Sequence, residues 1–384
     1  MRVAYINGDA GIPLFGGKGA AVHVRDFARA LTDLGHQVRI LTARAGAPLG
    51  SWPVPFEALA SSTDGSLSSE ERGLRLNRAT DAALKRCDAA TVLDLVYERY
   101  SLWSYAGLRF ARRMGLPFVL EVNSPLVVEQ SRYRSLGRDA TARRIERYLL
   151  AGATRVVAVS AEVGDYVCAH GGDASRVVVA TNGVDLSLYD EVPAVRREPD
   201  RFTVGFLGSL KPWHGVDVLV EMLEMLVARD RRYHLRVIGD GPERGRLEVA
   251  LAARQLSAHA TLVGQVARED VPRELAEVDC AVAPYPRLDD FYFSPLKVFE
   301  YMAAGRPIIA SRIGQIESVL EHRQTALLVE PGDPFALANA VEALQQEPAV
   351  AAALGTAARR RAFERHGWVH TVSASMSGLD GSRR

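Results

Sequence analysis

The segment CAVAPYPRLDDFYFSPLKVFEYMAAGRPIIAS, residues 280–311, holds two short apolar runs separated by a polar loop and an amphipathic stretch. The runs Cys280–Ala283 and Pro307–Ala310 are expected to be buried strands. The stretch between Ser294 and Gly305 is expected to be a helix. A strand, a helix and a second strand in this order predict one unit of a parallel sheet flanked by helices.

The same alternation extends through the rest of the chain. A helical stretch, Ala20–Leu34, follows the first apolar run, and later runs are separated in the same way. The further expected strands are Val3–Asn7, Gln37–Thr42, Val92–Tyr97, Phe118–Val122, Val156–Val159, Val177–Ala180, Phe202–Leu207, Leu235–Gly239, Ala260–Val263 and Ala326–Val329. The pattern therefore predicts an α/β protein with parallel sheets.

The alternation of strands and helices is interrupted once, and this interruption predicts two domains. The segment Asp190–Arg201 is polar, contains two prolines and lacks periodicity, which is typical of a linker. We therefore expect one strand and helix array over residues 1–190 and a second over 200–355. Residues 356–384 should form a helix followed by a polar tail from Ser373. Residues 45–69, rich in Ser, Pro and Gly, are expected to be a loop.

Composition excludes several classes of protein. Lys and Arg together number 47 against 46 Asp and Glu, so the net charge is +1 and nothing favours binding to nucleic acid. The three cysteines are widely spaced, which favours a reducing compartment. Neither a signal peptide nor an integral membrane segment is apparent, so we expect a cytoplasmic protein. The basic residues 132–147 are interpreted as a solvated helix face, with peripheral contact to a membrane-bound or phosphorylated acceptor as the alternative.

The helix after Ser294 carries the strongest chemical signal. Ser294 fits the N-cap and Pro295 the first helical position, so Lys297 would lie in the first turn. The helix dipole disfavours a cation there by several tenths of a kcal/mol, so an anion should offset it. A salt bridge to Glu300 is one explanation. A bound phosphate, held by the helix amides and Lys297, is the other.

Other loops between a strand and a helix repeat this chemistry. Residues 208–215, GSLKPWHG, place Lys211 and His214 before a helix, and the glycine pair Gly16 and Gly17 follows the first strand. Only four of the basic residues are lysines, and three of these four lie in such loops. A compact ammonium suits phosphate binding. The spacing matches neither GxGxxG nor the Walker sequence, so dehydrogenase and NTPase functions lose their best support.

Together these segments resemble the family-4, group 1 retaining glycosyltransferases of GT-B fold. The resemblance covers nearly the whole chain and is most specific over Ser294–Ser311, with Asn182-Gly-Val-Asp185, GSLKPWHG and GDGP in the family's order. It implies two Rossmann-like domains facing across a cleft. The first would bind mainly the acceptor and the second the nucleotide-sugar donor, and the C-terminal helix would cross back onto the first domain.

The resemblance also implies roles for individual residues. Glu300 matches the glutamate that holds the ribose hydroxyls. Lys297 lies next to the pyrophosphate, at the start of the helix with Ser294, Pro295 and Leu296. Gly16 and Gly17 match the loop that lets the diphosphate and the acceptor approach.

Four positions depart from the family pattern. Tyr292 stands where the first glutamate of the Glu-x7-Glu motif is expected. Ser209 and His214 stand where the family carries phosphate-binding Arg and Lys, and Lys211 would compensate. Asn123 stands where many relatives carry a His near the donor sugar. A charged His214 beside the diphosphate would make donor affinity fall as the pH rises from about 6 to 8.

The sequence thus predicts a retaining glycosyltransferase that moves a sugar from a nucleotide-diphosphate sugar to a hydroxyl of a glycan or small-molecule natural product. Asn123, Lys297 and Glu300 are the expected catalytic residues. No Asp-x-Asp and no His or Cys cluster with ligand spacing occurs, so neither a metal nor another cofactor is expected. The alternatives are a nucleotide-sugar epimerase or a phosphorylase of the same fold, and an inactive sugar-nucleotide-binding protein. The base, the sugar, the acceptor and the oligomeric state are left open.

Overall fold

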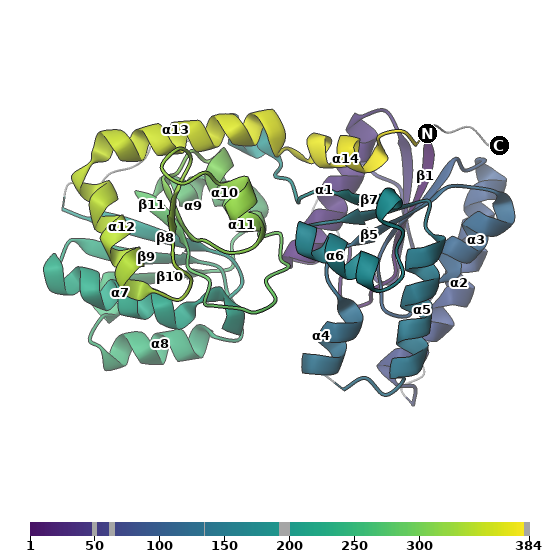
Figure 1. Ribbon diagram of the computed structural model, residues 1–384, viewed down its shortest axis with the longest axis horizontal. Coiled ribbons are helices and arrows are strands. Elements are labelled where there is room, and N and C mark those ends of the chain that lie inside the picture. Colours follow the sequence, from purple (N-terminus) through teal and green to yellow (C-terminus); the bar gives the residue numbers. More distant parts are fainter. Residues whose placement is uncertain (48–51, 61–65, 134, 192–199, 380–384) are drawn as a thin grey trace. The chain divides into compact units, whose positions relative to one another are not determined.

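The computed structural model describes residues 1–379 except 48–51, 61–65, 134 and 192–199 (Figure 1). The chain forms two compact units, each assembled from separate stretches of sequence. The N-terminal unit comprises Met1–Asn182, Tyr292–Ser294 and Trp368–Arg384, and the C-terminal unit comprises Gly183–Phe291 and Pro295–Gly367. Most of the expected linker Asp190–Arg201 lies outside the described residues.

The N-terminal unit is built on a sheet of seven parallel strands in the order β3-β2-β1-β4-β5-β6-β7. Its central strands are almost completely buried because helices cover both faces, as expected for near-continuous apolar runs. The strands are β1 (Arg2–Asn7), β2 (Gln37–Thr42), β3 (Phe56–Ala58), β4 (Leu95–Arg99), β5 (Phe118–Val122), β6 (Arg155–Ala158) and β7 (Val177–Val179).

The helices of this unit begin and end at recognisable caps. Ser68 and Glu71 form a capping box at the start of α2, and the Ser160 hydroxyl caps α6. Gly115 ends α3 in the left-handed conformation. The helices are α1 (Gly19–Asp33), α2 (Ser69–Ala90), α3 (Ala106–Met114), α4 (Leu126–Tyr133), α5 (Asp139–Gly152), α6 (Ala161–Ala169), the short η1 (Ala174–Arg176) and the C-terminal α14 (Trp368–Met376).

The C-terminal unit repeats the design with six parallel strands in the order β10-β9-β8-β11-β12-β13. Its strands are β8 (Phe202–Leu207), β9 (Tyr233–Ile238), β10 (Ala260–Gly264), β11 (Cys280–Ala283), β12 (Ile308–Ser311) and β13 (Leu327–Val329). Its helices are η2 (Leu186–Tyr189), η3 (Pro212–His214), α7 (Val216–Arg229), α8 (Arg244–Ala253), η4 (Ser257–His259), η5 (Arg268–Asp270), α9 (Val271–Ala276), α10 (Leu296–Ala303), α11 (Gln315–Val319), α12 (Pro334–Gln346) and α13 (Pro348–Arg365).

Several expectations need correction at the level of local structure. The strand predicted over 92–97 begins later, at Leu95, and ends at Arg99. Val92 is exposed, and the Asp94 carboxylate accepts a hydrogen bond from the Arg2 backbone N–H at 2.7 Å. Strand β3 was not expected in the Ser- and Pro-rich loop. The tail expected from Ser373 is helical as far as Met376, and residues 380–384 lie outside the described chain. No described helix is long and apolar enough to cross a membrane.

Candidate functional site

The strand order reverses between β8 and β11 in the C-terminal unit, with β9 and β10 on one side and β12 and β13 on the other. In doubly wound sheets, ligands bind beyond the carboxyl ends of the strands at such a reversal. The loop 208–215 leaves the end of β8, and the segment after β11 leads into α10. The candidate site of this unit is therefore formed by these two connections.

Close packing of glycine backbones shapes the loop after β8. Gly239, after β9, has a φ of 134°, and a Cβ at this position would lie 2.1 Å from the Gly208 carbonyl oxygen. Gly208 itself has a φ of 135°, and a Cβ there would lie 3.1 Å from Lys297 Nζ. Only glycine fits these positions without a shift. The two loops and the Lys297 side chain thus form one compact cluster.

Lys297 lies in the first turn of α10, as predicted, and is only 6% exposed. Its Nζ lies 4.0 Å from the ring centroid of Phe206 and 5.4 Å from that of Tyr285. Within the described chain this nitrogen has no hydrogen-bond partner. Burial lowers the pKa of Lys297 to about 7, although the charge of Glu300 acts in the opposite direction. Glu300 thus acts on Lys297 through its charge, and Nζ forms no hydrogen bond with it.

His214 is held as a neutral ring in the same cluster. Its Nδ1 contacts the Ser209 carbonyl oxygen, which can only accept a hydrogen bond, so Nδ1 carries the proton. Burial, together with the charges of Lys297 and Lys211, lowers the pKa of His214 to about 3 despite that bond. In the unliganded protein the pKa of His214 thus lies well below the ordinary value assumed for the pH prediction, whereas its charge beside a bound diphosphate stays a prediction. A second cation beside Lys297 is too costly in this buried place.

The start of α10 differs from the prediction by one residue. The helix begins at Leu296 with Pro295 as its N-cap residue, and no side chain caps it. The Ser294 hydroxyl instead accepts a hydrogen bond from the Asn182 backbone N–H at 3.0 Å. The Val298 N–H donates to the Pro295 carbonyl oxygen at 3.1 Å, so the amides of Leu296 and Lys297 are the ones available to an anion. Glu300 lies one turn further along the helix and is half-buried.

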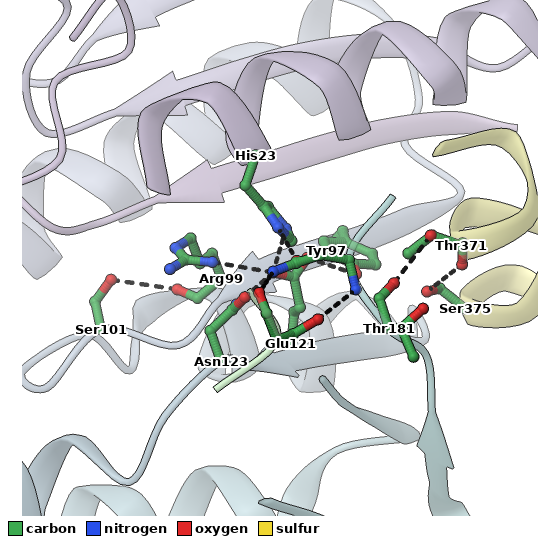
Figure 2. A network of polar contacts seen from close by, with 11 residues as sticks. His23, Tyr97, Arg99, Ser101, Glu121, Asn123, Thr181, Thr371 and Ser375 are labelled. Carbon is green, nitrogen blue, oxygen red and sulfur yellow. Dashed lines mark hydrogen bonds and ion pairs between the residues drawn. The ribbon is translucent and has the colours of Figure 1, made fainter. Parts of the chain in front are cut away.

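A second polar cluster lies at the carboxyl end of β5 in the N-terminal unit. Figure 2 shows four side chains converging on Glu121, which is fully buried. Their contacts come from Tyr97 Oη at 2.8 Å, Arg99 Nη1 at 3.2 Å, His23 Nε2 at 2.6 Å and Asn123 Nδ2. Burial would raise the pKa of Glu121, but His23 and then Arg99 lower it to about 2. The carboxylate is therefore charged, and Asn123 is oriented by it.

The remaining predicted residues are divided between the two units. Gly16 and Gly17 precede α1 in the N-terminal unit, where Arg25 donates to the Gly16 carbonyl oxygen at 2.9 Å. Tyr292, at the position of the family's first motif glutamate, donates its hydroxyl to Glu129 in that unit. The structure brings Ser209, Lys211, His214 and Lys297 together in the C-terminal unit and places Gly16, Gly17 and Asn123 in the other.

Sequence reasoning missed His23, Arg99 and Glu121. The apolar neighbours of Glu121 predict only a buried strand. The periodicity around His23 predicts only an amphipathic helix. The available signal was position, since Arg99 ends β4, Glu121 lies in β5 and His23 follows the glycine pair. In the basic segment, Arg143 binds Asp139 on the same helix at 2.8 Å and is exposed. No three His, Cys, Asp or Glu side chains among the described residues are arranged to hold a metal ion.

Comparison with known sequences identifies both halves of the chain. Residues 17–188 match the family described as Glycosyltransferase Family 4, and residues 201–347 match the one described as Glycosyl transferases group 1. The chain is 28% identical to the D-inositol 3-phosphate glycosyltransferase of Pseudarthrobacter chlorophenolicus, over 96% of this chain and 90% of that one. It is 30% identical to the protein of the same name from Rhodococcus opacus, over 73% of this chain and 65% of that one.

Solved structures share the fold over nearly the whole length. Sucrose-phosphate synthase from Thermosynechococcus elongatus superposes with a TM-score of 0.78 at 23% identity, covering 97% of this chain and 96% of that one. HepE from Anabaena, in complex with UDP-glucose, gives 0.75 at 20% identity and covers 99% of both chains. These likenesses establish the arrangement of two Rossmann-like domains, the GT-B fold.

Proposed function

Because the chain belongs to the family-4, group 1 glycosyltransferases, we propose that it moves a sugar from a nucleotide-diphosphate sugar to an acceptor hydroxyl. Transfer would retain the configuration at the anomeric carbon and use no metal ion. The observation that carries this proposal is the buried Lys297 amine at the start of α10, which has no hydrogen-bond acceptor within the described chain. Burial of an amine without a hydrogen bond is costly, so an anionic ligand would supply the missing interaction.

The chemistry asks mainly for charge stabilisation. Breaking the bond between sugar and phosphate builds oxocarbenium character on the sugar and negative charge on the departing diphosphate. Preorganised donors stabilise such charge best where water is excluded. Lys297 and the first amides of α10 would bind the diphosphate, and Lys211 would add a second cation from the loop after β8. His214 would act as a neutral group.

The remaining roles follow from the family resemblance. Glu300 would hold the ribose hydroxyls, and Gly16 and Gly17 would allow the ligands to approach the N-terminal unit closely. Asn123 would contact the donor sugar from an orientation fixed by Glu121. In a front-face reaction the departing phosphate accepts the proton of the attacking acceptor hydroxyl while the new glycosidic bond forms. The proton is thereby balanced without a protein base.

The acceptor is proposed only as a class, a glycan or a small-molecule natural product carrying a free hydroxyl. The relatives from Pseudarthrobacter and Rhodococcus are named for D-inositol 3-phosphate, so this compound belongs in the acceptor panel. Mono- and oligosaccharides and aglycones form its other arms. Nuclear magnetic resonance of the product would report retention directly through the anomeric coupling.

Donor binding provides the first test. Thermal unfolding should be measured with UDP-, GDP-, ADP- and dTDP-sugars, because a ligand at 100 times its dissociation constant adds about 2.7 kcal/mol of stability. Lys297→Ala should weaken binding of the best nucleotide by about 1.5–3 kcal/mol, the scale of a charge-assisted hydrogen bond. Lys85→Ala, which removes an exposed lysine on α2, is the matched control and should bind normally. Wild-type affinity in Lys297→Ala would contradict the proposal.

Turnover then separates the alternatives. An epimerase would convert the nucleotide sugar without any acceptor, whereas a transferase needs one. An inactive binding protein would give a thermal shift but no product across the acceptor panel. No observed feature favours either alternative over a glycosyltransferase.

A further inference from the structure

The chain crosses between the two units several times, and a residue of the N-terminal unit borders each crossing. It leaves after Asn182, passes through again at Tyr292–Ser294 and returns at Trp368. Asn182 links the first two of these stretches. Its backbone N–H donates to Ser294 Oγ at 3.0 Å, and its side-chain Nδ2 donates to the Ser294 carbonyl oxygen at 2.7 Å.

His23 contacts this junction from α1. Its Nδ1 lies 2.7 Å from Asn182 Oδ1, and its ring packs edge-on against Trp368 with 4.8 Å between ring centroids. The opposite ring nitrogen, Nε2, lies 2.6 Å from a Glu121 carboxylate oxygen. One buried side chain, 4% exposed, therefore joins a charged group of the sheet to two of the crossing points.

The geometry determines the protonation of this ring. Asn182 cannot be turned over, because its NH₂ group must face the Ser294 carbonyl oxygen. Its Oδ1 therefore faces His23, so His23 Nδ1 must donate. Nε2 faces a carboxylate at an ion-pair distance, although not along a straight hydrogen bond, and a lone pair there would be repelled. Both nitrogens thus face acceptors, an arrangement that suits an imidazolium, which carries a proton on each nitrogen.

Glu121 is suited to stabilise such a charge. Its carboxylate is buried, and its remaining contacts are all donors: Tyr97 Oη, Arg99 Nη1 and Asn123 Nδ2. In a buried ion pair, removing one partner leaves an uncompensated charge.

We propose that His23 is a positioning residue, held as an imidazolium by Glu121, which fixes Asn182 and Ser294 and thereby the chain entering α10. Ser294 lies three residues before Lys297 in the sequence, so a shift of Ser294 moves the start of the helix that carries this amine. The effect on donor binding rests on the proposed function. The charge on His23 does not depend on it.

The charge is tested in the wild-type protein without any ligand. Histidine labelled with ¹⁵N should show one imidazole at pH 7.5 with both nitrogens protonated, assigned through loss of its signals in His23→Gln. If that variant does not fold, the change of the same signals in Asn182→Ala assigns them. A His23 ring with one unprotonated nitrogen at this pH overturns the proposal.

The positioning role is tested by titrating whichever of UDP, GDP, ADP and dTDP gives the largest thermal shift. His23→Gln should weaken its binding about tenfold to hundredfold, the effect of a small misplacement of binding groups. His370→Gln, at an exposed position of α14, is the control and should change affinity less than about twofold.

A double variant separates positioning from general destabilisation. If His23 acts through Asn182, the combination His23→Gln with Asn182→Ala should bind no more weakly than the weaker single variant. Losses that multiply, or unchanged affinity in His23→Gln, overturn the positioning role. A wild-type protein that binds none of the four nucleotides contradicts the proposed function instead, and the charge measurement still stands.

Discussion

Donor binding should be coupled to proton uptake by Lys297. The amine is buried over two aromatic rings and its pKa is lowered to about 7, so about half of the unliganded molecules carry the neutral form at pH 7. A diphosphate favours the ammonium and raises the pKa of Lys297 again, toward its ordinary value. The ligand therefore binds together with a proton whenever the free amine is neutral.

The magnitude follows from linkage. The fraction of free protein with a charged Lys297 falls from one-half at pH 7 to about 1% at pH 9. The dissociation constant of the diphosphate should therefore rise about fivefold between pH 7 and 8 and about fiftyfold between pH 7 and 9, or about 2.3 kcal/mol. Below pH 6 the affinity should level off, because the amine is then fully charged.

Titration calorimetry in buffers of different ionisation enthalpy measures the proton directly. At pH 8.5 close to one proton should be taken up per nucleoside diphosphate bound, and at pH 7 about half of one. Lys297→Met should bind weakly with a flat pH profile. His214→Gln should keep the wild-type slope, because burial already holds His214 neutral throughout this range. Equal proton uptake in wild type and Lys297→Met would refute the reasoning, and a slope lost in His214→Gln would assign it to the histidine.

Three further predictions address the metal, a buried acid and the glycine loops. Activity should survive excess EDTA, and loss that Mg²⁺ or Mn²⁺ restores would contradict charge stabilisation by protein groups alone. Burial raises the pKa of Glu98 to about 7, so folding stability should fall by about 3 kcal/mol as the pH rises from 4 to 7. Urea titrations should find Glu98→Gln more stable than wild type at pH 8 but not at pH 4, with exposed Glu162→Gln unchanged at both. Gly239→Ala should lower the unfolding free energy by about 3 kcal/mol or more, because its Cβ would lie 2.1 Å from the Gly208 carbonyl oxygen. Gly245→Ala has open space around its Cβ and should be neutral or stabilising by up to about 1 kcal/mol. Equal melting temperatures for the two variants would contradict this packing.

The sheets were predictable because their strands are buried on both faces. Gln37–Thr42, Phe118–Val122, Phe202–Leu207 and Cys280–Ala283 have the predicted bounds, since each is a short apolar run between polar loops. Strand β3 escaped prediction because it has only three residues and none is buried. Lys297 was found because a cation in the first turn of a helix is locally anomalous.

The rest of the site depends on contacts between distant residues. Ser294 is a good N-cap by type, but its hydroxyl accepts from Asn182, which no local pattern reveals. His23 pairs with Glu121, and periodicity places both simply inside a helix and a strand. The neutral state of His214 likewise arises from burial beside Lys297, after the loop has folded. Local sequence predicts the helix, strand or loop in which these side chains lie. Their protonation depends on contacts that form only in the tertiary structure.

The packing of α14 against α1 bears on how the protein is made. The rings of His23 and Phe27, on α1, contact Trp368 on α14. Figure 1 shows these two helices side by side. A ribosome releases α1 before the C-terminal unit and α14 after it. The N-terminal unit must therefore keep this face of α1 uncovered while the whole C-terminal unit is translated. During that interval the nascent chain exposes aromatic surface, which is where a chaperone would be expected to act.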